Sequence, residues 1–380
     1  MTITFVTNFF HHHQWPLADQ LYKMIGVDYH FIATAPLSNM LVRGGYDPNQ
    51  DRPYLIQAYR DEESMNKARK LIDESDVVII GSAPIEWVFK RQSENKVTFH
   101  YCERWLKSNI WRYYMPTCLF NTWRNYGRFR NKRVYLLCAS AFAASDVRRF
   151  GCFPQKCFKW GYFSDVERLE NEAINRVKSL TDTTSIMWCA RFIDCKHPEL
   201  AIQLARRLKD RSYNISLNMF GTGENIDAAK ILCKNLDVED IVTFKGNVPN
   251  EEILNQMGQH DIFIFTSDRN EGWGVVLNEA MSCGCAVVAG DEIGSVPYLI
   301  KDGVNGFVFK SNNLASLEQK VTYLLDNKEL INQFGQAAIQ TMRKEWSPVV
   351  AAENFIKLAA YACENRLGEY DVFDGPASWA

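Results

Sequence analysis

The sequence predicts an α/β protein made of two doubly wound βα domains, and three observations support that fold class. Short apolar runs rich in valine, isoleucine and phenylalanine alternate along the chain with segments of helical periodicity. Many of these runs end at glycine or at polar residues, as parallel strands do where they enter a loop. The alternation restarts near Ser185, and 380 residues exceed what one small core accommodates. We therefore expect two parallel-sheet domains that face each other across a cleft.

The first half is expected to alternate strands with helices. The expected strands are Ile3–Thr7, Tyr29–Ala33, Asp76–Ile80, Lys96–His100, Val134–Ala139 and Lys156–Gly161, and the expected helices are Leu17–Met24, Met65–Ser75 and Ser140–Phe150. A charged stretch, Ser164–Leu180, is expected to link the two halves.

The second half is expected to repeat the pattern. The expected strands are Ser185–Ala190, Ile215–Phe220, Val242–Phe244, Ile262–Phe265, Ala286–Ala289 and Gly306–Phe309; the expected helices are Pro198–Leu208, a segment ending near Leu236, Glu251–Met257, one from about Val275 to Gly284, and others up to about Arg366. We place the domain boundaries at residues 1–165 and 166–345. Residues 346–380 are expected to form a helix and a tail that cross back to the first domain, although the tail from Gly368 has no periodicity.

The stretch from Thr266 to Gly290 organises the second half. A buried strand is followed by a turn at Glu271–Gly274, then by a helix and another strand, so the loop lies at the carboxyl ends of the strands. Free N–H groups at Gly274–Val276 would attract a phosphate. Two carboxylates, Glu271 and Glu279, frame that position and accept hydrogen bonds from hydroxyl groups. The combination suits a ligand with a sugar, a diphosphate and a ribose in a row.

A pair of cations points to the same ligand. Arg191 and Lys196 follow the first strand of the second half and precede a helix. Two cations at the carboxyl ends of strands suit a diphosphate, although such a pair alone would more often be surface charge.

Composition excludes several classes of protein. The chain has no apolar run long enough to span a membrane, and its first residues lack a signal-peptide pattern. The eleven cysteines are scattered without a CxxC pair, so the sequence indicates neither a zinc site nor a disulfide framework. A reducing cytoplasm is the expected location.

Charge is unevenly distributed. Residues 1–165 carry 22 basic against 15 acidic side chains, whereas the remainder carries 21 against 30. The stretch Arg104–Arg133 contains eight basic and eight aromatic residues and no acidic one. This composition suits the headgroup region of an anionic membrane, and we expect peripheral contact there. A solvated basic surface with aromatic residues packed inward, or a single-stranded nucleic-acid site, would have a similar composition.

Histidines mark two positions in the first half. His11, His12 and His13 lie in the loop after the first expected strand, where contact with a polar ligand competes with a plain loop role; three neighbours make a poor metal site. His100 is expected at the carboxyl end of a strand, where doubly wound domains contact ligands, although a structural histidine is as compatible with that position.

Four segments together resemble a known family. ARFIDCKHPELAIQLA, FGTGEN, VTFKGNV and EGWGVVLNEAMSCGCAVVAG occur in this order, beginning at Ala190, Phe220, Val242 and Glu271. They are similar to the C-terminal half of the nucleotide-sugar glycosyltransferases of family 4, which have the GT-B fold. The similarity is close from Ser185 to Phe309 and loose in the N-terminal half.

The resemblance implies a retaining, metal-independent hexosyltransferase without a cofactor. It implies a nucleoside diphosphate sugar as donor in residues 166–345 and a glycan or lipid-linked acceptor in residues 1–165, in polysaccharide or glycolipid biosynthesis at the inner face of the plasma membrane. The implied catalytic residues are His100, Glu271, Arg191 and Lys196. The implied donor contacts are Arg191, Lys196, Gly223, Asn247, Val248, Glu271, Gly272, Trp273, Gly274, Val275 and Glu279, with Glu271 on the sugar and Glu279 on the ribose.

The sequence departs from the family pattern in its first loop. Phe9 to His13 replace the small-residue glycine turn that is common there, which leaves the acceptor residues His11, His12 and His13 the least supported assignment. Two other functions stay open: a GT-B enzyme of another reaction, such as a nucleotide-sugar epimerase or a phosphorylase, and a non-catalytic sugar-nucleotide binder. Nucleic acid is not expected as a partner.

Overall fold

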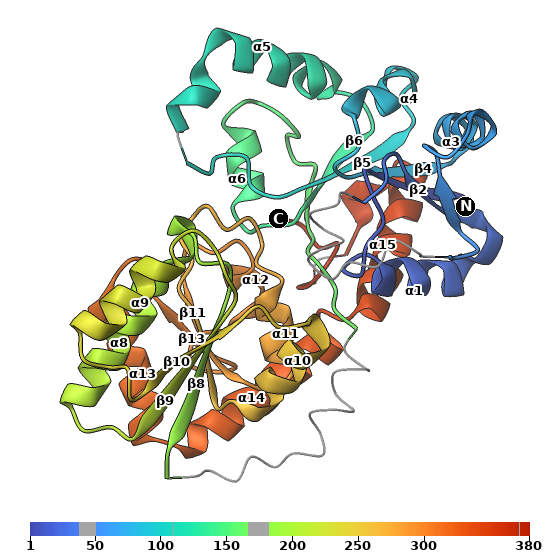
Figure 1. The fold of residues 1–380 in the computed structure, drawn as a ribbon. Helices are drawn as coiled ribbons and strands as arrows, with labels where there is room; N and C mark the ends of the chain where they lie inside the picture. The colour runs from blue at the N-terminus through green and yellow to red at the C-terminus, as the bar shows by residue number, and fades with distance from the viewer. Residues whose placement is uncertain (38–50, 109, 166–181, 372) are drawn as a thin grey trace. The chain divides into compact units, whose positions relative to one another are not determined.

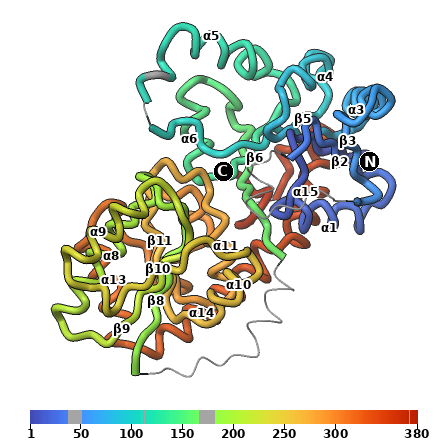
Figure 2. The backbone as a smooth tube through the Cα atoms, viewed as in Figure 1, coloured from blue at the N-terminus to red at the C-terminus, as the bar shows by residue number. Residues whose placement is uncertain are grey.

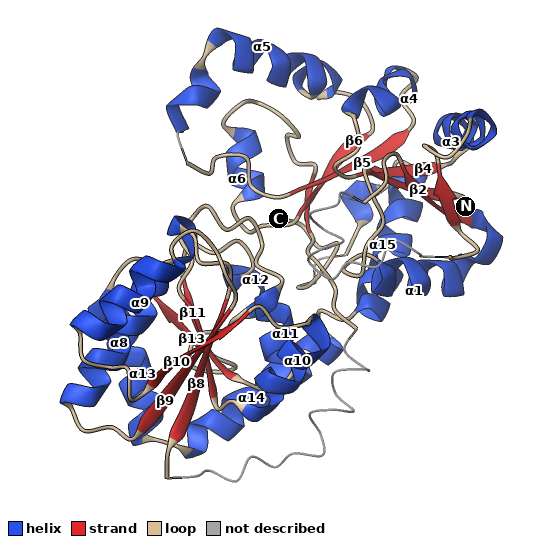
Figure 3. Cartoon of the chain, in the orientation of Figure 1, coloured by secondary structure: helices blue, strands red, loops and turns tan. Residues whose placement is uncertain are grey.

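The computed structural model describes residues 1–37, 51–108, 110–165, 182–371 and 373–380, and the chain divides into two compact units (Figures 1 and 2). The first unit contains Met1–Ser164 and Trp346–Ala380, and the second contains Asp165–Glu345. Each unit has its own parallel β-sheet with helices around it (Figure 3). The predicted fold class, two doubly wound α/β domains, is confirmed.

The sheet of the first unit has, among the described residues, seven parallel strands in the order β3-β2-β1-β4-β5-β6-β7. Its strands are β1 (Ile3–Thr7), β2 (Tyr29–Ala33), β3 (Leu55–Gln57), β4 (Val77–Ile80), β5 (Val97–Cys102), β6 (Val134–Cys138) and β7 (Cys157–Lys159). The chain runs outward from β1 to β3 and then returns to pair β4 with the other side of β1. The carboxyl ends of β1 and β4 therefore form a topological switch point, where such sheets bind ligands.

Helices of the first unit include one from the C-terminal part of the chain. They are α1 (Trp15–Ile25), α3 (Glu62–Glu74), α4 (Phe89–Ser93), α5 (Pro116–Asn125), α6 (Ala143–Arg148) and α15 (Pro348–Cys363), with short 3-10 turns at Gly26–Asp28, Ile85–Val88, Ile110–Tyr114, Gly127–Phe129 and Leu367–Glu369. Helix α15 packs against α1 (Figure 1). Ser347 caps its N-terminus, because the Ser347 hydroxyl accepts a hydrogen bond from the backbone N–H of Val350. Pro348, the first helical residue, has no backbone N–H that would need a partner.

The last residues of the chain cover the edge of the first sheet. The backbone N–H of Lys159 in β7 donates to the carbonyl of Ser378, and the N–H of Ala377 donates back to Lys159, both at 2.7 Å. Phe158 and Trp379 pair across this contact, with ring centroids 4.5 Å apart. A paired edge strand is protected from association with other chains. The sequence offers no period-two signal in this tail.

The sheet of the second unit has, within the described part of the chain, six parallel strands in the order β10-β9-β8-β11-β12-β13. Its strands are β8 (Thr184–Cys189), β9 (Ile215–Phe220), β10 (Val242–Gly246), β11 (Ile262–Phe265), β12 (Ala286–Gly290) and β13 (Phe307–Phe309). The switch point lies between β8 and β11.

Two groups of helices accompany this sheet. Helices α9 (Ile226–Asn235) and α13 (Leu314–Asp326) both contact α8 (Pro198–Asp210), whereas α10 (Asn250–Gln259) and α14 (Glu329–Lys344) both contact α11 (Val276–Ser282) (Figure 3). The remaining short elements are a 3-10 turn, Asp194–Lys196, and α12 (Val296–Leu299). Strand side chains such as Ile186, Leu217 and Ile264 pack with Leu204 and Val321 in one buried core. Burial on both faces explains why β11 is a continuous apolar run.

Several element boundaries differ from those expected. Strand β5 continues to Cys102, so His100 lies inside it rather than at its end. Strand β7 is shorter than expected, β3 had no prediction, and α6 occupies only the middle of its expected range. The expected link at Ser164–Leu180 lies almost entirely outside the described residues.

Candidate functional site

The carboxyl edge of the second sheet brings together the residues predicted for the second half. Arg191 and Lys196 follow β8, Gly223 follows β9, Asn247 and Val248 follow β10, and Glu271 to Val275 follow β11. Because all these strands are parallel, their carboxyl ends share one edge, and the loops after β8 and β11 flank the switch point.

Lys196 and Glu271 form an ion pair across this switch point. Each side chain is only 14% exposed, so solvent screens the pair less than it would at the surface. The Ser267 hydroxyl donates a second hydrogen bond to the same Glu271 oxygen at 3.1 Å. The sequence assigned Lys196 to a diphosphate and Glu271 to a sugar; the structure brings the two side chains into direct contact.

The loop that carries Lys196 is anchored by neighbouring side chains. The hydroxyl of Thr266 at the end of β11 donates to the carbonyl of Lys196 at 2.7 Å, and it accepts from the indole N–H of Trp188 at 2.9 Å. These contacts fix the backbone of the loop after β8 to the end of β11, where the other loop begins. Sequence reasoning missed this role of Thr266, although its position at a strand end was a usable signal.

His197 ties the same two loops together. Its Nδ1 lies 2.7 Å from Glu199 Oε1, and its Nε2 lies 3.3 Å from Asp268 Oδ2. The hydrogen bond to Glu199, opposed by partial burial and helped by Asp268, raises the pKa of His197 above its usual range. Protonation of the His197 imidazole therefore strengthens its contacts with Glu199 and Asp268, which connect the two loops.

Close backbone approach explains the predicted glycine after β9. A Cβ on Gly223 would lie 2.4 Å from the carbonyl oxygen of Phe192, so only glycine fits here without displacement. This packing holds the loop after β9 against the loop after β8, where Arg191 is exposed. Asn247 is exposed and Val248 is half-buried beyond β10.

Glu279 lies beneath these loops and is buried. Burial raises its pKa to about 7, while a hydrogen bond from Asn250 opposes that shift. The nearby Cys189 thiol has its own pKa raised to about 12, chiefly by burial, so it is neutral. Because this carboxyl group is half protonated near neutral pH, a new hydrogen-bond donor beside it would lower its pKa and change its charge.

Trp273 has a different role from the one expected. Its side chain is buried, and its indole N–H donates to Asn278 Oδ1 of α11 at 2.8 Å. The indole therefore packs the loop onto its helix, and Gly272 beside it is also buried. Gly274 has φ +85°, and a Cβ there would meet the Phe265 ring at 2.6 Å. Val275 follows as the N-cap residue of α11 and is half-buried.

His100 is packed inside the first unit. It is 5% exposed, its Nε2 lies 2.5 Å from the Gln92 amide nitrogen, and its ring contacts Tyr126 and Phe153. Burial lowers its pKa to about 3, which makes the imidazole neutral at physiological pH. These are contacts of a structural histidine, and its catalytic role stays a prediction.

Comparing two substitutions separates these roles. For the sugar transfer that the resemblance implies, we expect His100→Ala to reduce turnover far more than Gln92→Ala, because Gln92→Ala removes the same hydrogen bond but keeps the imidazole. Both changes remove a buried polar partner and are expected to lower the free energy of unfolding by about 1–3 kcal/mol. Turnover and thermal unfolding are measured for both variants. Equal losses of turnover would assign His100 to structure alone.

His11, His12 and His13 form a compact aromatic group in the loop between β1 and α1. The His12 and His13 rings lie 4.0 Å apart, and the His13 ring lies 6.4 Å from that of Tyr162. Burial and the neighbouring imidazoles lower the pKa of His11 to about 4 and that of His13 well below its usual range. Across the described ranges no group of three or more histidine, cysteine, aspartate or glutamate side chains has the arrangement of a metal site.

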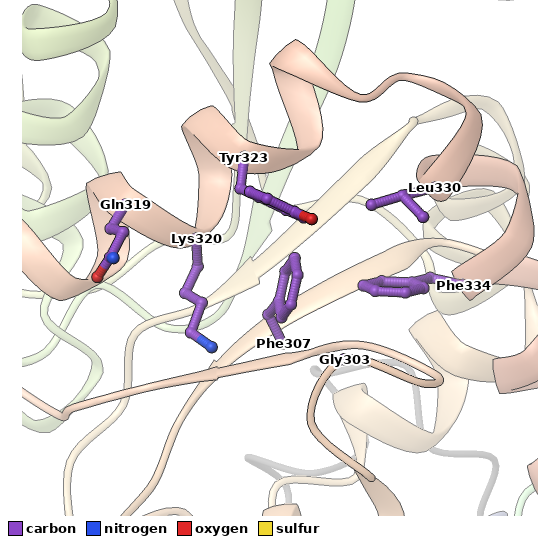
Figure 4. Close-up of a pocket in the computed structure, with 7 residues that line it drawn as sticks. All are labelled: Gly303, Phe307, Gln319, Lys320, Tyr323, Leu330 and Phe334. Carbon is purple, nitrogen blue, oxygen red and sulfur yellow. The ribbon is translucent and has the colours of Figure 1, made fainter.

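A pocket of about 390 Å³ lies elsewhere in the second unit, at the edge strand β13 (Figure 4). Phe307, Tyr323 and Phe334 supply its aromatic wall, and Lys320 points into it while pairing with Asp302. None of its lining residues belongs to the predicted site.

Comparison with known proteins finds a family match in the second unit. Residues 170–341 match the family model for glycosyl transferases group 1. The chain is 28% identical over 130 residues to N-acetyl-alpha-D-glucosaminyl L-malate synthase of Bacillus anthracis, covering 34% of this chain and 33% of that protein. It is 26% identical over 194 residues to the putative colanic acid biosynthesis glycosyltransferase WcaL of Escherichia coli, covering 49% and 47%. The chain thus spans between a third and a half of the length of these relatives.

Solved structures share the whole fold. Anabaena Alr3699/HepE in complex with UDP superposes with a TM-score of 0.70 at 14% identity, covering 95% of this chain and all of the other. At this identity the likeness establishes the architecture alone. The chain therefore has the GT-B fold, and its residues 170–341, which lie in the second unit, are similar to the glycosyl transferases of group 1.

Proposed function

We propose that this chain transfers a sugar from a nucleoside diphosphate sugar to a glycan or lipid-linked acceptor. One observation supports the proposal: Lys196 and Glu271 meet across the switch point of the second sheet. The exposed Arg191 lies in the same loop as Lys196, and the buried Glu279 lies in the helix that follows the loop of Glu271. Cations that neutralise phosphates and carboxylates that accept sugar hydroxyls are thereby held at one sheet edge. The donor would bind there.

The proposed donor contacts follow from charge. Arg191 and Lys196 would form ion pairs with the diphosphate. The same two cations would stabilise the negative charge that develops on the phosphate as the nucleotide leaves. Glu271 would then turn from Lys196 toward sugar hydroxyls, and Glu279 would accept hydrogen bonds from the ribose. The structure of Anabaena HepE with UDP supports a nucleotide in this fold.

The proposed reaction retains the anomeric configuration without a metal. The acceptor hydroxyl would attack on the face from which the nucleotide leaves, and the leaving phosphate would receive its proton. His100 and the loop His11–His13 are proposed to serve the sugar and acceptor in the first unit. Matched relatives named for colanic acid and poly(glycerol-phosphate) support an acceptor from polysaccharide or glycolipid biosynthesis.

A two-stage assay tests this proposal against its rivals. Thermal shift with UDP-glucose, UDP-N-acetylglucosamine and GDP-mannose identifies the donor, and product analysis with lipid-linked glycan acceptors follows. We expect rapid release of free nucleotide only when acceptor is present. An epimerase would convert the nucleotide sugar without releasing nucleotide, a phosphorylase would require phosphate, and a non-catalytic binder would do neither.

We also propose that the first unit docks on an anionic membrane at the inner face of the plasma membrane. Large apolar side chains stand out on η3 (Ile110–Tyr114) and α5: Trp111 is 85% exposed, Phe120 58% and Trp123 57%. Met115 and Leu119 are exposed between them, and no described helix is long and apolar enough to span a bilayer. Exposed Arg124, Arg128 and Arg130 follow at once. Aromatic rings beside cations match the headgroup region of anionic lipids.

Vesicle co-sedimentation tests the membrane proposal. Each cation near the surface contributes about 1 kcal/mol, so we expect binding to phosphatidylglycerol vesicles at low salt and release at high salt. The triple change of Trp111, Phe120 and Trp123 to Ser should reduce this binding at least tenfold. Changing Ile231 and Val304, equally exposed in the second unit, to Ser is the control. Equal binding to neutral vesicles, or none to either type, would contradict the proposal.

A further inference from the structure

The first unit carries a second cluster of polar side chains, of which the sequence singled out only the histidine loop. It lies at the carboxyl edge of the seven-stranded sheet and contains Tyr101 and Glu103 from the end of β5, Tyr162 after β7, and the histidine loop after β1. All these side chains are half-buried, so they are held by neighbours and still reach solvent.

Hydrogen bonds and ring contacts connect the cluster through Tyr162. Its hydroxyl donates to Glu103 Oε1 at 3.3 Å, and its ring lies 5.8 Å from Tyr101 and 6.4 Å from His13. Lys107 donates to the other Glu103 oxygen at 2.9 Å. A carboxylate has about four acceptor positions, so Glu103 retains capacity for further donors.

The charge of this cluster is balanced. Glu103 is paired with Lys107 four residues along the chain, and the tyrosines are neutral. Because burial lowers the pKa of His11 to about 4 and those of His12 and His13 in the same direction, the histidine loop adds no positive charge at neutral pH. At the adjoining switch point, the hydroxyls of Thr7 and Ser82 lie 2.9 Å apart, and Ser82 also donates to Asn8.

Such a surface suits hydroxyl groups rather than phosphates. A phosphate dianion needs cations in excess of carboxylates, or several aligned N–H groups. Here one carboxylate, phenols, hydroxyls and neutral imidazoles form hydrogen bonds with either donors or acceptors. Exposed arginines of the first unit, Arg124, Arg128 and Arg130, lie instead at the end of α5 and directly after it.

We propose that this edge of the first sheet binds a neutral, hydroxyl-bearing sugar residue of the acceptor, with Glu103 accepting hydrogen bonds from its hydroxyls. The inference deepens the proposed function, because it takes the ligand to be the acceptor of the transfer. It makes Glu103 a specificity-determining residue and Tyr162 the residue that positions its carboxylate.

Ligand-observed NMR on the full chain tests the inference without nucleotide. Methyl α-D-glucopyranoside, methyl α-D-mannopyranoside and glucose 6-phosphate are the probes, and saturation transfer gives their relative affinities. We expect at least one methyl glycoside to bind and glucose 6-phosphate to bind no more tightly. Glu103→Gln should weaken the glycoside at least tenfold, and Tyr162→Phe by a smaller factor because the ring remains.

Glu94→Gln is the matched control. Glu94 also pairs with a lysine, Lys96, at 2.9 Å, but it precedes the other end of β5. It should leave glycoside binding unchanged. Absence of glycoside binding, tenfold tighter binding of glucose 6-phosphate, or equal effects of Glu103→Gln and Glu94→Gln would overturn the inference.

A separate titration keeps the two proposals distinguishable. UDP-glucose binding to the same variants reports the second unit. If UDP-glucose fails to bind while the glycoside signal depends on Glu103, the proposed donor function fails and the neutral-sugar site stands. If UDP-glucose binds normally and the glycoside signal does not depend on Glu103, only the neutral-sugar site is refuted.

Discussion

Replacing both Arg191 and Lys196 by alanine is expected to weaken UDP-glucose binding roughly 10²- to 10⁴-fold and to remove turnover. Each substitution would remove charge-assisted hydrogen bonds to the diphosphate, which contribute about 1.5–3 kcal/mol to the binding free energy. Calorimetry measures the affinity, and nucleotide release measures the turnover. The matched control replaces Arg206 and Lys209, which form ion pairs near the other end of α8. If the Arg191, Lys196 double variant keeps both its UDP-glucose affinity and its turnover, the assignment of these two residues to the diphosphate is wrong.

The Lys196–Glu271 ion pair allows a sharper form of this experiment. Lys196→Met alone leaves the half-buried Glu271 carboxylate without its cation beside the diphosphate, so part of the loss is repulsion. The double variant Lys196→Met, Glu271→Gln removes that repulsion and should bind UDP more tightly than Lys196→Met alone. Glu271→Gln alone should not weaken UDP, because it frees Lys196 for the phosphates, yet it should reduce sugar transfer. A loss of UDP affinity in Glu271→Gln would contradict this division.

Sequence patterns predicted the two sheets well because burial on both faces produces apolar strands. Strands such as β1, β8 and β11 were found within a residue of their observed limits, since each is bounded by polar residues or glycine. Chain order then placed Arg191, Lys196 and Glu271 at one sheet edge, because parallel strands share their carboxyl ends. Those arguments need only local sequence and topology.

Local sequence patterns could not predict the direction of individual side chains or the contacts between residues far apart in the chain. The sequence does not indicate that Trp273 turns inward to Asn278, because that contact depends on how the loop folds onto its helix. It does not indicate that Lys196 meets Glu271 either, because that contact depends on how two loops pack. The tail around Trp379 has no strand signal because contacts with residues far away in the chain, among them Phe158 of β7, order it. Glu103 was overlooked for a similar reason: its partner Tyr162 is 59 residues away in the chain.

Nucleotide binding is also expected to release a proton from Glu279 and to strengthen as pH rises from about 5.5 to 7. In the free protein burial raises the pKa of this carboxyl to about 7, so it is mostly protonated at pH 6. Ribose hydroxyls that donate to it favour the ionised form and lower its pKa in the complex. Below pH 7 binding therefore expels a proton, and affinity rises with pH by up to about tenfold per unit.

Calorimetry with UDP-glucose in two buffers of different ionisation enthalpy measures this proton. UDP-glucose is the probe because its diphosphate is esterified at both ends and has no ionisation of its own in this pH range. Release should approach one proton per nucleotide at pH 6 and vanish near pH 8.5. Glu279→Gln should abolish the release and flatten the pH dependence. His197→Gln is the control for the other titrating group beside the loops, whose pKa is raised. If proton release persists in Glu279→Gln and disappears in His197→Gln, the His197 imidazole is the group that releases the proton. The proposed contact between Glu279 and the ribose would then be wrong.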